Sequence, residues 1–277
     1  VVVVGYVYES LGVCNEAGEG TECTQSHRTD VHCWPPARLV DAVVIKAQFS
    51  KKSSIPNFPT HAAVFTISLW YTCVHMIKER ENKELTTIVQ SLMQEGKGIL
   101  AADESDATAG KRLEIAGLPN QPGNRQDFRE IMFTAPGIEE YLSGVILYDS
   151  TIRENTDAGI PFVDVLAARG IVPGIKVDMG AKELQKFPGE VVTEGLDNLS
   201  LRLEEYYTLG ARFTKWRSVV TIGNGIPSDE ILRLNAIQFA LYALRVQEAH
   251  MVPVVEPEVI FNGNHSLQTA ESVTTHA

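Results

Sequence analysis

Cysteine is scarce in this sequence and absent from most of it. The 277 residues include four cysteines, and none follows Cys73. A zinc site could be drawn only from Cys14, Cys23, His27, His32 and Cys33. Those residues lack the short C-x(2–4)-C pair that structural zinc sites usually contain, so we expect no metal site. The distribution also marks a compositional boundary near residue 75.

Basic residues are outnumbered, and no apolar run is long enough to cross a bilayer. Lys and Arg total 24 against 35 Asp and Glu, for a net charge of -11. Nucleic acids are bound mainly through Lys and Arg contacts to phosphate, so we expect no nucleic-acid partner. The longest apolar stretch, Ala62 to Val74, is shorter than the roughly 20 residues a spanning helix needs. The opening VVVVGYVYES has no basic start, unlike a secretory signal, and we expect a cytoplasmic protein that does not enter membranes.

The first 75 residues contain no methionine, which gives a second boundary at the same place. After Met76, apolar residues at helical spacing predict a helix: Leu85, Ile88, Val89, Leu92 and Met93. Upstream, only Val1 to Tyr8 and Ala62 to Thr72 are typical of strands. We therefore expect residues 1–75 to be a leader without a fold of its own. A transit peptide is the alternative, which the glutamates of this segment disfavour.

Short apolar runs separated by longer amphipathic stretches follow from Gly98 onward. The predicted strands are GILAAD at 98–103, GVILYD at 144–149, IVPGIKVD at 171–178, FTKWRSV at 213–219 and VPVVEPEV at 252–259. Helices are predicted over Leu196 to Leu209 and Ser228 to Ala249, the second capped by Ser228. Alternation of strand and helix predicts a parallel sheet. Because no GxGxxG follows the first strand, the pattern favours a (β/α) barrel over a dinucleotide-binding fold.

Charged residues stand at the carboxyl ends of four of these strands. They are Asp103, Lys176, Asp178, Lys215, Arg217, Glu256 and Glu258. An ionised side chain inside a barrel is costly unless it is paired, so one interpretation is a set of ion pairs that closes the barrel mouth. The other is an active site, because the carboxyl ends of parallel barrel strands converge on the catalytic face.

Four motifs in series give these strands a family resemblance. GKGILAADES, GIKVDMG, TKWRSV and VPVVEPE, joined by NRQDFRE and SGVILYDSTI, resemble class I fructose-bisphosphate aldolase across residues 76–277. Two positions depart from the family pattern: Thr108 stands where a serine is usual, and Met179 where a lysine is common. The resemblance implies an α/β fold, an incomplete TIM (β/α)8 barrel of about five parallel strands, preceded by the irregular extension 1–75.

The resemblance also implies roles for individual residues. Asp103 matches a carboxylate that orients the reacting hydroxyl, Glu256 matches the proton shuttle, and Lys215 lies beside the central carbons of the substrate. The substrate-binding residues that it implies are Lys111, Arg125, Lys176, Arg217 and Glu258. Asp178 is expected to pack against a basic neighbour. The chemistry needs no metal or cofactor, and its substrate is a phosphorylated sugar.

The family reaction uses a further lysine on a sixth strand, which attacks the ketose carbonyl. No lysine follows Lys215 in this sequence. We therefore expect an aldolase by ancestry that cleaves no substrate as it stands, with an exposed edge on its fifth strand. A non-catalytic sugar-phosphate binder or scaffold is the alternative, and a phosphosugar isomerase barrel would explain the architecture but not the motifs. A tetramer is implied by the family.

Overall fold

The computed structural model describes residues 2–3 and 83–277. The cysteine and histidine cluster, the strand fragment at 62–72 and the start of the Met76 helix lie outside the described residues. The first described helix covers residues 83–92, and its apolar face contains Leu85, Ile88 and Val89, which pack against a buried cluster with Leu92. Met93 was wrongly predicted on this face, because the helix has ended and the side chain is 65% exposed.

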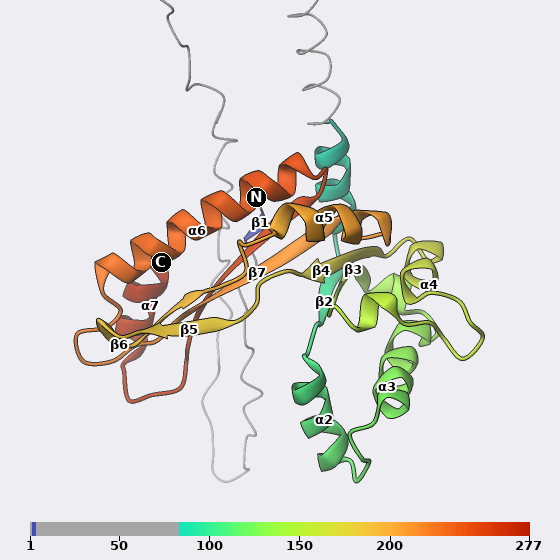
Figure 1. The fold of residues 1–277 in the computed structure, drawn as a ribbon, viewed down its shortest axis with the longest axis horizontal. Helices are drawn as coiled ribbons and strands as arrows, with labels where there is room; N and C mark the ends of the chain where they lie inside the picture. The colour runs from blue at the N-terminus through green and yellow to red at the C-terminus, as the bar shows by residue number, and fades with distance from the viewer. Residues whose placement is uncertain (1, 4–82) are drawn as a thin grey trace, which may run out of the picture. The chain divides into compact units, whose positions relative to one another are not determined.

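A six-stranded parallel sheet is the main sheet of the described residues (Figure 1). Its strands, in spatial order, are β1 (Val2–Val3), β8 (Val252–Val259), β7 (Phe213–Val220), β4 (Val172–Lys176), β3 (Leu142–Leu147) and β2 (Gly98–Ala102). From β2 to β8 the spatial order follows the chain order, as in consecutive strands of a (β/α) barrel. The five predicted strands are confirmed as a half-barrel, although Asp178 lies beyond the end of β4 rather than inside it.

Helices follow most of the strands. They are α2 (Asp106–Ile115), α3 (Pro122–Thr134), α4 (Phe162–Ala168), α5 (Leu199–Thr208), α6 (Asp229–Glu248) and α7 (Leu267–His276), with short 3-10 helices at Ile138–Glu140 and Thr151–Arg153. Both predicted helices are confirmed, and the Ser228 side chain caps α6 by accepting a hydrogen bond from the Ile231 amide. None of the described helices is long and apolar enough to span a membrane.

The two faces of β7 have different surroundings. Trp216 is fully buried and its ring lies 5.3 Å from that of Tyr242, which belongs to α6. Side chains alternate along a strand, so Phe213 and Lys215 point to the opposite face. There Phe213 is fully buried beside Gly174 of β4, where an added Cβ would lie 2.3 Å from the phenyl ring. The missing side chain at residue 174 therefore makes room for the aromatic ring.

A two-stranded antiparallel sheet was not predicted from the sequence. It consists of β5 (Ala181–Leu184) and β6 (Phe187–Thr193). Glu190 of β6 is buried, and its carboxylate accepts a hydrogen bond from the Ser228 amide at 2.7 Å. The hairpin is thereby joined to the start of α6.

The edge of β8 is partly covered, contrary to the expectation that it is open. Val2 and Val3 of β1 pair in parallel with Val254 and Val255. The pairing involves two residues on each strand, so the correction applies to this part of the edge. Val2 and Val3 thus lie on the side of β8 that faces away from β7.

Candidate active site

The strand register places most of the predicted charged residues on one face of the sheet. Lys176 of β4 is the direct neighbour of Lys215 on β7, and Arg217 is the neighbour of Glu256 on β8. Directly paired residues of parallel strands point to the same side, and the period of two adds Glu258 to that side. Phe213, two residues before Lys215 on β7, lies on the same face of the sheet.

Lys215 lies between two carboxylates that come from different strands. Its Nζ is 2.7 Å from Oδ2 of Asp103 and 3.3 Å from Oε2 of Glu256. The three side chains are at most 10% exposed. Asp103 directly follows β2, and the other two residues lie within β7 and β8. The structure therefore brings together the three residues predicted to be catalytic; their catalytic roles stay a prediction.

The second carboxylate has an oxygen that is ion-paired with Lys215 but accepts no hydrogen bond in the described residues. Oε2 of Glu256 is buried and accepts no hydrogen bond within the described part of the chain, although it lies close to Lys215. A buried acceptor without a donor is unfavourable, and such groups call for a specific explanation. An arriving hydroxyl or water could donate to this oxygen. The group thus combines a cation, an ion-paired carboxylate and a carboxylate oxygen that can receive a proton.

Two further cations border this group, and each is paired. The Lys176 amine donates to Asp178 Oδ1 at 2.6 Å, which gives Asp178 the basic neighbour that was expected. Asp178 also accepts from the Arg217 amide at 3.2 Å, so it links the end of β4 to β7. The Arg217 guanidinium donates to Glu258, and this hydrogen bond raises the pKa of Arg217. An anion that reached these cations would compete with the two carboxylates.

Lys111 and Arg125 are not brought to this group by any contact in the described residues. Lys111 lies exposed on α2. Arg125 lies near the start of α3, where it donates to Asn120 Oδ1 at 2.6 Å and lies 3.6 Å from Asp106. Their predicted substrate contacts stay predictions.

One pair of functional interest was missed by reasoning from the sequence. Glu104 follows Asp103, and its carboxylate accepts hydrogen bonds from Arg112 and from the buried Arg129. Arg129 lies in the NRQDFRE motif, but its distance of 25 residues from Glu104 gave no signal of a contact. Only the fold reveals that α3 supplies a partner to the loop after β2.

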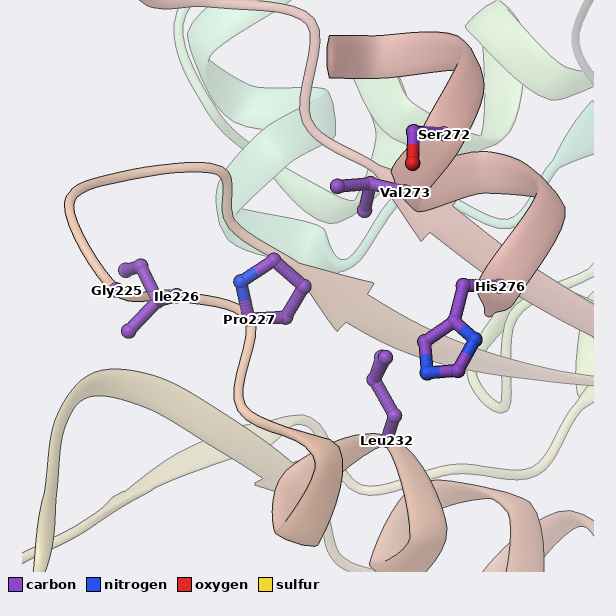
Figure 2. A pocket seen from close by; sticks show the side chains of 7 residues that line it. All are labelled: Gly225, Ile226, Pro227, Leu232, Ser272, Val273 and His276. Carbon is purple, nitrogen blue, oxygen red and sulfur yellow. The ribbon is translucent and has the colours of Figure 1, made fainter.

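A separate pocket of about 370 Å³ lies between α6, α7 and the loop that precedes α6 (Figure 2). It is lined by Gly225, Ile226, Pro227, Leu232, Ser272, Val273 and His276. None of the predicted site residues lines it. His276 is directed toward the start of α6, where its Nε2 lies 3.3 Å from Asp229. Within the described residues, no group of histidines, cysteines and carboxylates could hold a metal ion.

Comparisons with known proteins agree on one family. A family model described as fructose-bisphosphate aldolase class-I matches residues 84–277. The probable fructose-bisphosphate aldolase class 1 of Xanthomonas axonopodis pv. citri is 50% identical over 192 residues, which are 69% of this chain and 58% of that protein. A cytoplasmic isozyme from Cicer arietinum is 47% identical over 198 residues, 71% of this chain and 55% of the relative.

A solved structure gives the same result. The fructose-bisphosphate aldolase of Plasmodium falciparum, in complex with TRAP and a small-molecule inhibitor, superposes with a TM-score of 0.69 at 42% identity. The match covers 70% of this chain and 57% of that one. The present chain thus spans a little over half the length of the proteins it matches.

Proposed function

The chain belongs to the class I fructose-bisphosphate aldolase family, and on that premise we propose that its Lys215 group serves the cleavage of fructose 1,6-bisphosphate. The products are dihydroxyacetone phosphate and glyceraldehyde 3-phosphate. The observation that carries the proposal is the burial of Lys215 between Asp103 and Glu256. Ionisable side chains that meet from separate strands, at the carboxyl end of a barrel, are typical of an active site.

Each residue has a proposed task. Glu256 takes up and returns a proton through Oε2, which accepts no hydrogen bond in the described residues, and Asp103 orients the hydroxyl of the substrate. The Lys215 ammonium stabilises negative charge that develops on the substrate oxygens. Lys176 and Arg217 hold a phosphate, which must displace Asp178 and Glu258 from them, while Lys111 and Arg125 supply further positive charge.

The bond-breaking step requires one more group. In this family a lysine on the following strand forms a Schiff base with the ketose, and the sequence has no lysine after Lys215. We propose that the described residues supply the acid–base and phosphate-holding part of the site. A polypeptide of these 277 residues should therefore give no covalent adduct when fructose 1,6-bisphosphate is trapped with borohydride. A stable adduct would contradict this assignment.

A chimera tests the aldolase function directly. The chain is extended after Ala277 by the part of the Xanthomonas relative that follows its matched residues. The chimera should cleave fructose 1,6-bisphosphate, and Lys215→Met should reduce kcat at least a hundredfold, by analogy with the loss of a group that stabilises developing charge. Lys182→Met, at an exposed site on β5, serves as the matched control. A folded chimera that binds the sugar without cleaving it would favour the non-catalytic binder instead.

The location and the assembly are also proposals. Relatives from Cicer arietinum and Arabidopsis thaliana are named as cytoplasmic or cytosolic isozymes, which supports a cytoplasmic location for this protein. A homotetramer is the assembly that the family implies. Sedimentation of the chimera would test it, and a purely monomeric species would contradict it.

A further inference from the structure

Asp103 lies in the short loop between β2 and α2 and takes no part in the pairing of the strands. The last residue pair of β2 joins Ala102 to Leu147, and α2 starts at Asp106. Ser105 caps α2, so residues 103 and 104 lie between the two elements, and the Asp103 carboxylate lies 2.7 Å from the Lys215 amine. Glu104, the residue after Asp103, has a further contact that restricts the direction of this loop.

Arg129 makes that contact from a distant part of the chain. It belongs to α3 and is 2% exposed. Its Nη1 donates to the Glu104 carboxylate, and its Nη2 donates to the Glu104 backbone carbonyl at 3.1 Å. One guanidinium thus holds both the side chain and the main chain of the residue after Asp103. The planar fork of arginine is suited to such paired contacts, whereas lysine offers a point charge.

Charge neutralisation alone does not account for this arrangement. A buried guanidinium needs an acidic partner, and the Glu104 carboxylate would meet that need by itself. Glu104 already has a second cationic partner in Arg112, whose side chain is 55% exposed. The contact with the backbone carbonyl balances no charge. It restricts the main chain of the loop instead.

We propose that Arg129 is a positioning residue, which acts through Glu104 to hold the Asp103 carboxylate against Lys215. Its relevance to catalysis rests on the proposed aldolase function, but the geometric effect does not. Arg112 contacts only the side chain of Glu104, from the exposed side. It supplies charge to Glu104 without restricting the backbone.

The test measures how fast Lys215 is acylated in the 277-residue chain without ligand. A lysine-selective N-hydroxysuccinimide ester is used, and the modified peptide is quantified by mass spectrometry. An amine held by a carboxylate must leave that contact before it can attack the ester, so the Asp103 partner slows the reaction. Asp103→Asn sets the rate for complete loss of the ion pair. We expect a rise of roughly tenfold, as for the loss of one hydrogen bond to a charged group.

Arg129→Met should also raise the acylation rate of Lys215. The change in the logarithm of this rate should be at least half of the change caused by Asp103→Asn. Arg129→Lys should behave similarly, because a single ammonium does not reproduce the fork. Arg112→Met should change the rate less than twofold. Combined with Asp103→Asn, Arg129→Met should add no further rise, since residues that act through one pair are not additive. A general loosening of the fold would raise the rate further in the double variant.

Two results would overturn the proposal. One is a wild-type rate in Arg129→Lys, which would reduce the role of Arg129 to charge balance. The other is an additive rise in the double variant. If Arg129→Met does not fold, Arg129→Lys replaces it in both the single and the double variant. The same two comparisons then decide whether Arg129 positions Asp103.

A separate arm addresses the proposed function. Fructose 1,6-bisphosphate should protect Lys215 from acylation in the wild-type chain. Lack of protection would count against substrate binding at Lys215, and the ligand-free rates would still decide the role of Arg129.

Discussion

Glu154 is a half-buried carboxylate whose ionisation opposes folding. Burial raises the pKa of Glu154, and the nearby negative charge of Asp106 adds to the effect. Because the folded-state pKa is raised, the protonated form stabilises the fold, and this contribution is lost as the pH rises through that pKa. Glu154→Gln should therefore stabilise the protein at pH 7 and give no gain below about pH 4. The gain should be a few tenths of a kcal/mol, because the half-exposed group is screened by solvent.

Urea unfolding at the two pH values measures this difference. Glu114→Gln, at an exposed position on α2, removes the same charge and is the matched control. Equal gains for Glu154→Gln at both pH values would show that the ionisation of Glu154 is not responsible.

Gly174 is required by the aromatic ring that lies below the charged group. A Cβ at this position would lie 2.3 Å from the Phe213 ring, and Phe213 is fully buried. Gly174→Ala should lower the free energy of unfolding by about 1–3 kcal/mol, the usual range for overpacking. Gly98→Ala is the control, because its Cβ would meet nothing within 4 Å. Urea midpoints give both values, and equal midpoints for the two variants would contradict the packing argument.

Single residues differ in how far the sequence predicts their surroundings. Lys215, Asp103 and Glu256 could be anticipated, because charge at the end of a buried strand is costly and needs a reason. Asp178 could be anticipated as an ion-pair partner but not as the link to the Arg217 amide. The hydrogen bonds from Arg129 to Glu104 could not be anticipated, because nothing in the sequence spacing relates α3 to the loop after β2.

At the scale of elements, β1 pairs with part of the edge of β8. Unpaired amides and carbonyls on an edge strand promote association with other chains. Replacing Val2 and Val3 by proline removes two amide donors and should weaken the pairing with Val254 and Val255. We expect faster aggregation, followed by light scattering at constant protein concentration. Threonine at both positions keeps the amides and the strand propensity and should aggregate like the wild type. Equal rates for the proline and threonine variants would contradict a protective role.

The sequence predicted the central strands and the helices α5 and α6 better than it predicted the hairpin. Continuous apolar runs identify strands that are buried on both faces. The segment AKELQKFPGEVVT of β5 and β6 mixes polar and apolar residues and includes a proline, so it lacks both the apolar run and the alternation of a typical strand. Its order comes partly from Glu190, whose carboxylate binds the Ser228 amide at the start of α6. Such tertiary contacts have no local signature.

For the whole molecule, the parallel sheet and its strand order were predictable from the alternation of strands and helices. The pairing of β1 with β8 could not be predicted. The last residue of β1 and Val252 are separated by 248 residues, and no local sequence pattern relates them. Four motifs in series were needed to identify the family, because the architecture alone is shared by enzymes of many functions.

The molecule is acidic as a whole, but one face of its sheet carries a cluster of basic side chains. The net charge is -11, yet Lys176, Lys215 and Arg217 share one face of the sheet. A small phosphorylated sugar can use this local cluster, whereas duplex DNA needs an extended basic surface. Fructose 1,6-bisphosphate at a hundred times its Kd should raise the free energy of unfolding by about 2.7 kcal/mol. A 20-base-pair duplex should give no stabilisation at physiological salt.

Thermal unfolding at matched ionic strength measures both effects, with sodium chloride in place of the ligand as the reference. Lys176→Met combined with Arg217→Met should abolish most of the stabilisation by the sugar, because the phosphate loses both cations. Lys182→Met on the exposed hairpin strand removes the same kind of charge elsewhere and should leave the stabilisation intact. Equal losses in the two cases would mean that the anion responds to the general field of the protein. The face that carries Lys215 would then have no special role in binding it.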